Sequence, residues 1–402
     1  MKNLFKITIV FIFVSLFSNA QQISCDCKTD LDFMVEKMKK MPSYKKQIVG
    51  EKKTEFENTY QEISSKMKSP IGIEACYQLL LKQMTLINDG HVGLSVNTKF
   101  YNAEKNVNLF NNSLTDETKI SDLQSSLKNK PETSPEGIYT FKNEIIGITY
   151  LNNDSKTLVG YVLESDLLNW KKGDVRFYLY PTSGKKYNMY YYNTDTKTPG
   201  FVTSLTLENG RIWSYKKEGN TNNFELSSEK VDVATFKQIN DNVQYLYFKT
   251  FGNHKKKELK AFIADTKNKI TADNVIVDLR NNSGGNSKFS DPFVKVLKNK
   301  NVYVITNCFA GSNGEQFTLE LLKNKKAKHL GQATRGVIAY GKNYGYDYDT
   351  PSGHFKFTPT DMNFHEFIDY EGKGVEPEIK LDFDRDWIEQ TLEVIEADKN
   401  KA

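Results

Sequence analysis

The feature that most constrains the fold of this chain is a regular alternation of apolar and amphipathic segments that begins near Val243. Short runs of apolar, β-branched and aromatic residues are separated by segments in which apolar residues recur at helical spacing. Continuous apolar strands between amphipathic helices predict a mainly parallel sheet that is covered on both faces. The expected strands are 245–248, 275–279 and 302–306, and the expected helices lie around 259–263, 289–297 and 317–322.

Two turns at the ends of successive strands in this region carry chemically useful residues. Residues 278–285 read DLRNNSGG, and the paired glycines leave bare backbone N–H groups after a buried strand. Ser312 lies in AGSNGE, which closes the next strand and opens a helix. Because sites in such sheets gather where strands end and helices begin, we expect the two turns to be neighbours. A serine beside glycine amides can supply a nucleophile and oxyanion donors for acyl transfer.

Each turn alone also has a structural interpretation. The glycine pair can form a tight strand-to-helix turn. Ser312, with Glu315 three residues later, fits a capping box, in which the serine caps the helix and the glutamate reaches back. The presence of both turns at neighbouring strand ends favours the chemical interpretation.

The chain before this region divides into blocks of different composition. The first has apolar residues at helical spacing, and the second is rich in Asn, Ser, Thr, Lys and Asp. The third has short β-branched and aromatic runs, and Asn209-Gly210 between two of them is a strong hairpin signal. We expect an α+β multidomain protein, with an N-terminal helical domain over 21–100, a polar connection over 101–136, an antiparallel β-domain over 137–225 and the α/β domain over 226–402.

The first twenty residues have the pattern of a secretory signal peptide. Lys2 and Lys6 precede an apolar run over 7–17, and Ser18-Asn19-Ala20 offers a small-residue cleavage site. Because the apolar run is too short to span a bilayer, we expect removal of 1–20 without stable membrane insertion. The mature protein is then periplasmic or extracellular.

Export makes disulfide bonds possible for some of the four cysteines. A bridge from Cys25 or Cys27 to Cys76 would link the N-terminal tail to a helix. Cys308 lies at the end of an apolar strand and is expected to be a buried free thiol. We expect no metal site, because Cys25-Asp26-Cys27 is too tight for a zinc knuckle and no other pair has ligand spacing.

The charge balance argues against a nucleic-acid partner. The chain has 55 Lys and Arg residues and 50 Asp and Glu residues, so loss of Lys2 and Lys6 leaves a net charge of +3. That excess is too small to indicate binding to a polyanion.

The two turns also resemble the core of a known enzyme family. DLRNNSGG is followed, 27 residues after Gly285, by the serine of GSNGEQF, which is similar to the C-terminal-processing (tail-specific) and tricorn-core serine peptidases. The resemblance implies a ClpP/crotonase-like α/β fold for the last domain, with Ser312 as the nucleophile. It also implies peptides or unfolded protein tails as substrates, and no metal or organic cofactor.

Two further segments resemble the tricorn-like branch of that family. Residues 87–91, INDGH, are similar to its Asp-x-His motif, which implies His91 as the catalytic histidine. Residues 370–378, YEGKGVEPE, resemble its late Gly-Val-x-Pro-Asp segment, and Glu371 stands at the position of its acidic residue. Gly90 departs from the branch, which has a serine before its histidine.

A second departure separates this chain from the processing branch, which uses a Ser–Lys dyad. Val337 occupies the position of that lysine, and Lys342 lies five residues too late. A Ser–His pair is therefore expected, because a neutral imidazole can accept the proton of the serine. His365, six residues before Glu371, is the rival base.

The sequence thus predicts a secreted serine peptidase in which Ser312 attacks the carbonyl, His91 shuttles the proton and Glu371 supports the site directly or through water. Two other classes stay open: a catalytically inactive peptide-binding protein on the same fold, and an esterase. The N–H groups expected to stabilise the oxyanion are those of Gly284 or Gly285 and of Asn313.

Overall fold

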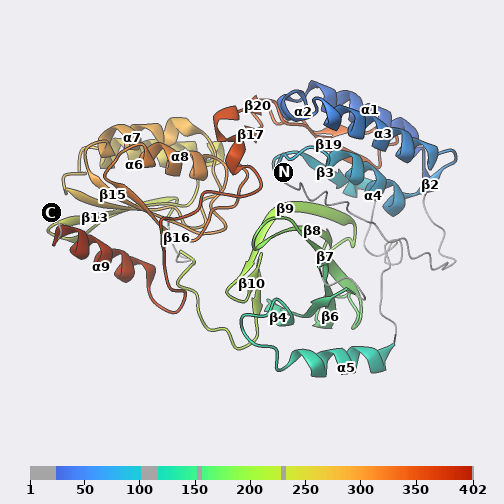
Figure 1. Cartoon of the computed structure of the whole chain (residues 1–402), viewed down its shortest axis with the longest axis horizontal. Helices are drawn as coiled ribbons and strands as arrows, with labels where there is room; N and C mark the ends of the chain where they lie inside the picture. Colours follow the sequence, from blue (N-terminus) through green and yellow to red (C-terminus); the bar gives the residue numbers. More distant parts are fainter. Residues whose placement is uncertain (1–23, 101–115, 152–155, 228–231, 401–402) are drawn as a thin grey trace, which may run out of the picture.

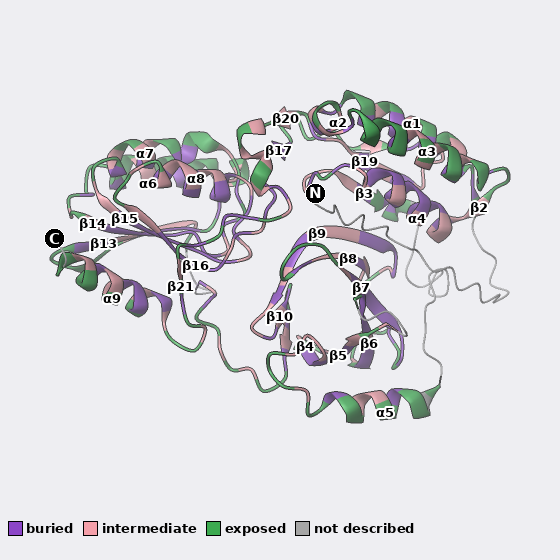
Figure 2. Cartoon of the chain, in the orientation of Figure 1, coloured by how far each residue is buried: buried purple, intermediate pink, exposed green. Residues whose placement is uncertain are grey.

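The computed structural model describes residues 24–100, 116–151, 156–227 and 232–400, so the expected signal peptide lies outside the described residues. Three bodies are visible in Figure 1: a helical body, a β-barrel and an α/β body that contains the C-terminus. Their interiors are buried and the outer helix faces are exposed (Figure 2). None of the described helices is long and apolar enough to cross a membrane.

The α/β body is built on a six-stranded sheet whose order is β12-β13-β14-β15-β16-β21. The five strands from β13 to β21 are parallel, and β12 is an antiparallel edge strand. Leu246, Val277 and Val304 lie in register across three of them. The strands are β12 (Ala234–Asn240), β13 (Val243–Phe248), β14 (Asn274–Asp278), β15 (Asn301–Thr306), β16 (Ala327–Gly331) and β21 (Ile379–Lys380).

Helices cover both faces of this sheet, which confirms the expected parallel architecture (Figure 1). Val277 faces a cluster that includes Phe293 and Phe317. The adjacent Ile276 faces a second cluster around Trp387. The first face carries η2 (Asn253–Lys255), α6 (Lys256–Thr266), η3 (Ser287–Phe289), α7 (Asp291–Leu297) and α8 (Asn313–Leu322), and the second carries α9 (Trp387–Lys399).

The expected antiparallel β-domain is a closed barrel of eight strands. Its hairpin at Asn209-Gly210 is confirmed, since both residues have positive φ (50° and 59°) and Glu208 pairs with Arg211. The strands are β4 (Gly137–Phe141), β5 (Glu144–Tyr150), β6 (Leu158–Ser165), β7 (Val175–Pro181), β8 (Lys186–Tyr192), β9 (Pro199–Glu208), β10 (Arg211–Ile212) and β11 (Tyr215–Lys217).

The segment expected to be a polar connection over 101–136 contains a helix, α5 (Glu117–Leu127). Residues 101–115 lie outside the described residues. Ile120 and Leu127 of α5 pack with Ile138 and Leu163 of the barrel. This small apolar face is enough to attach an otherwise polar helix to the barrel.

The helical body is linked by a disulfide between Cys27 and Cys76, which confirms one of the two expected pairings. Cys25 is a buried free thiol, and Cys308 is free but only half-buried. The elements are β1 (Ser24–Cys25), α1 (Cys27–Lys40), α2 (Pro42–Gln47), α3 (Glu51–Ser65), β2 (Ile71–Gly72), α4 (Ile73–Met84), β3 (Gly93–Val96) and η1 (Thr98–Phe100).

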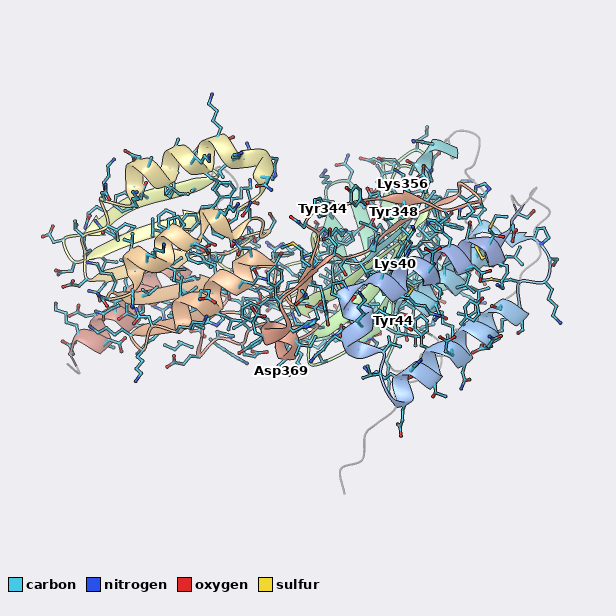
Figure 3. The ribbon with its side chains drawn as sticks, turned by 90° about the horizontal axis from the view of Figure 1, so that it is seen from above. Lys40, Tyr44, Tyr344, Tyr348, Lys356 and Asp369 are labelled. Atoms are coloured by element: carbon cyan, nitrogen blue, oxygen red, sulfur yellow. A yellow bond between two sulfur atoms is a disulfide. The ribbon has the colours of Figure 1, made fainter. Side chains whose placement is uncertain are left out.

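A late segment of the chain returns to this helical body. β19 (Phe355–Thr358) pairs with β3 on one side and with β18 (Tyr348–Asp349) on the other. Seen from above in Figure 3, Tyr348 and Lys356 lie beside the helices of this body, whereas Asp369 lies at the junction with the α/β body. The segment also contains β17 (Tyr340–Gly341), β20 (Met362–Asn363) and η4 (His365–Tyr370).

Candidate active site

Ser312 lies in the turn between β15 and α8 and has a strained backbone. Its φ of 55° and ψ of −125° are unfavourable for a residue with a side chain. Ser312 and Glu315 occupy the two positions of a capping box, and the Glu315 carboxylate accepts a hydrogen bond from the Ser312 N–H at 3.0 Å. The Ser312 hydroxyl also faces the N–H of Glu315, but that N–H donates to the Ser312 carbonyl at 2.9 Å. The hydroxyl can therefore also bind another partner.

The glycine pair lies directly against this turn, as the order of the strands predicts. Gly284 has a φ of 77°, and a Cβ atom at this position would lie 2.5 Å from the Cβ of Ser312. Only glycine therefore fits here without moving the serine.

The two glycines differ in what their N–H groups do. The N–H of Gly284 donates to Asn282 Oδ1 at 2.8 Å, so it is already occupied. Gly285 forms a parallel β-bridge with Phe251, but its own backbone groups do not make the hydrogen bonds. The Phe251 N–H donates to the Gly284 carbonyl at 2.7 Å, and the Asn286 N–H donates to the Phe251 carbonyl at 2.8 Å. The N–H of Gly285 therefore points away from Phe251.

Asn313 offers a second free donor beside the nucleophile. It is the first residue of α8, where backbone N–H groups have no partner within the helix. Its side chain is held separately, because Asn313 Nδ2 donates to Ser290 Oγ at 3.0 Å. Of the three donors expected from the sequence, those of Gly285 and Asn313 make no hydrogen bond to the residues that the structure describes.

His91 reaches Ser312 from the helical body, 221 residues away in sequence. Its Nε2 lies 3.2 Å from Ser312 Oγ. Asp89 shapes the turn that carries the histidine: Oδ1 accepts the N–H groups of His91 at 3.0 Å and Val92 at 3.3 Å. Oδ2 accepts the Thr360 hydroxyl at 2.6 Å, which connects this turn to the late segment of the chain.

The surroundings of His91 favour its neutral form. Burial lowers its pKa to about 4, and the positive charges of Lys342 and Arg335 contribute in the same direction. A neutral ring at pH 7 can accept a proton from the serine. The other ring nitrogen, Nδ1, is buried and has no hydrogen-bond partner among the described residues.

Glu371 contacts the backbone beside His91 and makes no hydrogen bond to the ring within the described residues. Its Oε1 accepts the Gly90 N–H at 2.7 Å, and its Oε2 accepts those of Ile338 and Ala339 at 2.8 Å each. Burial raises the pKa of Glu371 to about 7, the three hydrogen bonds oppose that shift, and nearby Asp89 adds to it. Glu371 is therefore placed to position the histidine turn.

Glu315 has a similar arrangement that the capping-box interpretation missed. Besides Ser312, this fully buried carboxylate accepts the Thr334 hydroxyl at 2.6 Å and the N–H groups of Gly336 and Val337 at 2.7 and 2.9 Å. The two glutamates thus bind consecutive parts of the segment 334–339. The only signal in the sequence was an acidic residue three positions after the serine.

Val337 fills the space between the turn that carries His91 and the turn that carries Ser312. Its carbonyl accepts the Ser312 N–H at 3.0 Å. A Cβ atom at Gly90 would lie 2.2 Å from Val337 Cγ1, and one at Gly311 would lie 3.2 Å from Val337 Cγ2. Gly90, where the tricorn-like pattern has serine, and Val337, where the processing pattern has lysine, are therefore direct neighbours.

The rival bases do not reach Ser312. His365 opens η4, where its ring packs against Tyr340 with centroids 6.0 Å apart. Among the described residues, neither His365 nor Lys342 makes a hydrogen bond to the serine. The one group of described residues with metal-ligand spacing is Cys25, Cys27 and Cys76, and two of these form the disulfide.

Comparison with known proteins identifies a family for one segment of the chain. Residues 242–291, from β13 to the start of α7, match peptidase family S41. The matched segment includes both glycines of the candidate site and ends before Ser312. A search of curated proteins finds no match.

Several solved structures are similar to this chain. Mature CPAF is 12% identical with a TM-score of 0.45, over 92% of this chain and 96% of that one. A lipoprotein from Streptococcus agalactiae is 9% identical with a TM-score of 0.42, over 94% of this chain and 99% of that one. The tricorn protease is 10% identical with a TM-score of 0.42, over 92% of this chain and 36% of that one.

Proposed function

We propose that this chain is a serine peptidase of family S41 with a Ser–His pair. The observation that carries the proposal is the 3.2 Å approach of His91 Nε2 to the hydroxyl of a strained serine that lies against a Gly-Gly turn. The match of 242–291 to peptidase family S41 supports it independently.

In this mechanism, Ser312 Oγ attacks the carbonyl carbon of the scissile peptide bond while His91 Nε2 accepts its proton. The N–H groups of Gly285 and Asn313 donate to the oxygen that becomes negative. Collapse of the tetrahedral intermediate breaks the C–N bond, and His91 donates its proton to the leaving amine. Water, deprotonated by the same histidine, then hydrolyses the acyl-enzyme.

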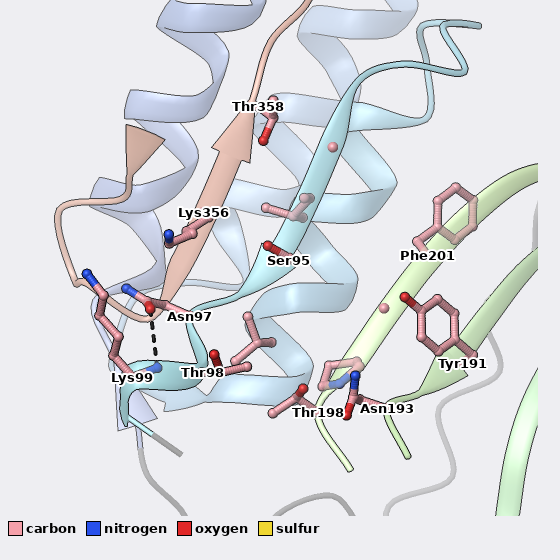
Figure 4. Close-up of a pocket in the computed structure, with 15 residues that line it drawn as sticks. Ser95, Asn97, Thr98, Lys99, Tyr191, Asn193, Thr198, Phe201, Lys356 and Thr358 are labelled. Atoms are coloured by element: carbon pink, nitrogen blue, oxygen red, sulfur yellow. Dashed lines mark hydrogen bonds between the residues drawn. The ribbon is translucent and has the colours of Figure 1, made fainter. Parts of the chain in front are cut away.

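A groove beside the histidine turn fits an extended peptide. It has a volume of about 480 Å³ and is lined by β3 and by β9 of the barrel, with Ser95, Tyr191 and Phe201 among its walls (Figure 4). Its lining begins at Gly93, two residues after His91. The Asn97 N–H donates to the His354 carbonyl, so Asn97 and His354 form a hydrogen-bonded pair. Pairs in an antiparallel ladder alternate, so the next pair, Val96 and Phe355, is not hydrogen-bonded, and the N–H and C=O of Val96 point away from β19. We assign this groove to substrate residues on one side of the scissile bond.

A fluorophosphonate probe tests the proposal, because it labels an activated serine and not a mere cleft. We expect stoichiometric labelling of Ser312, located by peptide mass spectrometry, and hydrolysis of unfolded protein substrates. Ser312→Ala should abolish both while lowering the free energy of unfolding by no more than about 0.5–2 kcal/mol, the usual cost of losing a serine cap. Unlabelled wild-type protein with no hydrolysis of a broad peptide panel would contradict the proposal.

One observation favours the second candidate, a peptide-binding protein without activity. The Nδ1 atom of His91 has no partner among the described residues, so no carboxylate orients the ring or stabilises an imidazolium directly. This candidate predicts peptide binding with equal affinity in the wild type and Ser312→Ala, and no labelling.

We also propose that the protein is exported. The pattern of residues 1–20 and the Cys27–Cys76 disulfide both fit an oxidising compartment. N-terminal sequencing of the mature protein from cell fractions, with Gln21 expected first, tests this.

A further inference from the structure

Arg335 lies next to the nucleophile without having a role in the mechanism above. Its backbone N–H donates to the carbonyl of Ala310 at 2.8 Å. Its side chain runs beside Gly311, where a Cβ atom would lie 3.7 Å from Arg335 Cδ. The guanidinium then extends toward the barrel, where Nη2 lies 3.4 Å from the carbonyl of Thr203 in β9.

The guanidinium makes few hydrogen bonds for a half-buried cation. It has five N–H donors, and the long contact to Thr203 is a weak use of one of them. Its Nε atom is buried and has no partner, and within the described part of the chain the side chain forms no ion pair. Burial lowers its pKa from the usual value, which reflects the cost of a cation without a counter-ion.

The nearest acidic groups do not neutralise this charge by direct contact. Glu315 and Glu371 use their oxygens to accept backbone N–H groups and the Thr334 hydroxyl. A buried cation, Lys186, lies nearby: its Nζ donates to the carbonyl of Thr334 at 2.8 Å and to Thr206 Oγ1 at 3.2 Å. Lys186 also forms no ion pair among the described residues.

We propose that Arg335 is a specificity residue that binds a carboxylate on the substrate residue next to the scissile bond. This inference rests on the proposed peptidase function. A planar guanidinium matches a carboxylate through two parallel hydrogen bonds, and a substrate bound at Ser312 would bring its neighbouring residue to Arg335. The carboxylate has two sources: the α-carboxylate of a chain end, or the side chain of Asp or Glu.

Matched peptides separate these sources. One sequence that the wild type cleaves is prepared as four peptides. The first has neutral residues next to the cut and a C-terminal amide, and the second ends in a free α-carboxylate one residue beyond the cut. The third and fourth have a C-terminal amide and carry Glu directly before or directly after the cut. We expect wild-type kcat/KM to favour one acidic form over the neutral amide by about 10- to 100-fold, the usual range for a charge-assisted pair. Arg335→Gln should remove the preference and Arg335→Lys should keep part of it.

Arg385→Gln is the matched control, because Arg385 is an exposed cation paired with Glu393 far from the site. It should leave the preference unchanged. A wild type that cleaves all four peptides equally, or a preference that survives Arg335→Gln in protein with a normal circular dichroism spectrum, would overturn the inference.

If the wild type cleaves none of the peptides, the proposed function fails, but binding of a carboxylate by Arg335 can still be tested. The test is the affinity of Ser312→Ala for each labelled peptide, measured by fluorescence anisotropy. Tighter binding of an acidic peptide, lost in Ser312→Ala/Arg335→Gln, supports the inference. Equal affinity for acidic and neutral peptides, or no binding of any of them, overturns it.

Discussion

The nucleophile turn and the histidine turn are fixed in different ways. Glu315 binds the nucleophile turn to residues 334–337, all within the α/β body. The histidine turn belongs to the helical body and is joined to the late part of the chain through Glu371 and through the Asp89–Thr360 hydrogen bond. The serine is therefore positioned by one body, whereas the histidine depends on contacts between two.

The two buried glutamates share the direction of their pKa shift. Burial raises the pKa of both. For Glu371 the value is about 7, so the group that positions the histidine turn titrates in the physiological range. The position of the histidine turn is thus expected to respond to pH.

The largest effect is expected for Glu315→Ala. It leaves up to four buried donors without their acceptor, so we expect a loss of about 3–5 kcal/mol in the free energy of unfolding and no activity. Chemical denaturation and peptide hydrolysis measure both. The matched control is Glu320→Gln on the same helix, which loses only an ion pair to exposed Lys323 and should change stability by less than about 0.5 kcal/mol. Equal effects of the two changes would show that the nucleophile turn is not fixed by Glu315.

Glu371→Gln should show whether Glu371 positions the histidine turn for catalysis or only stabilises the fold. The amide replaces an acceptor oxygen with a donor, so one of its backbone contacts is lost and kcat/KM should fall by about 10- to 100-fold in folded protein. The wild-type rate should rise with pH through about 7, as the carboxylate becomes a full acceptor, because neutral His91 does not titrate there. Glu371→Gln should remove this rise. A rise that persists in the variant would assign it to another group.

The same titration has a stability consequence of the opposite sign. The folded-state pKa of Glu371 lies above that of an unfolded glutamate, so the folded state binds more protons between pH ~4.5 and about 7. The contribution of Glu371 to stability therefore falls as the pH rises through that window. For His91, whose folded-state pKa is lowered to about 4, stability falls as the pH drops from ~6.5 toward 4. Thermal unfolding of each Gln variant against pH should show one of these slopes removed.

A smaller loss of activity is expected for Gly90→Ala, which tests the contact between the histidine turn and Val337. The new Cβ would lie 2.2 Å from Val337 Cγ1, so the histidine turn must move and activity should fall about tenfold. Val337→Ala removes the obstacle, and the double variant should regain part of the loss. A double variant as impaired as the sum of the single changes would show that the two side chains do not interact.

The smallest effect on activity is expected from loss of the disulfide. The Cys27→Ser/Cys76→Ser variant should lose about 2–4 kcal/mol of stability and keep most of its kcat/KM, since the bridge lies within the helical body away from the turn. Both cysteines are changed because the sulfurs of Cys25, Cys27 and Cys76 lie within 4.8 Å of one another, so Cys25 could replace Cys27. A large loss of activity would mean that the histidine turn is sensitive to the whole helical body.

The parallel sheet was predictable because its strands are continuously apolar and each is followed by an amphipathic helix. Closure of the barrel was not, because it depends on pairing between Lys216 and Thr140, which no local pattern encodes. The proximity of Ser312 and Gly284 followed from strand order. The contact of Glu315 with the Ser312 N–H followed from the capping box, but the contacts of Glu315 and Glu371 with residues 334–339 did not, because that segment has no periodicity. Arg335 gave no signal, since only the structure shows that it forms no ion pair with the described residues.

The central claim is that His91, from the helical body, activates Ser312 in the α/β body. The most direct measurement is the second-order rate constant for fluorophosphonate labelling of the wild type and of His91→Gln, with His365→Gln as the control and Ser312→Ala as the blank. We predict that His91→Gln labels about 10²- to 10⁴-fold more slowly and that His365→Gln labels at the wild-type rate. Labelling of His91→Gln at the wild-type rate would contradict the claim.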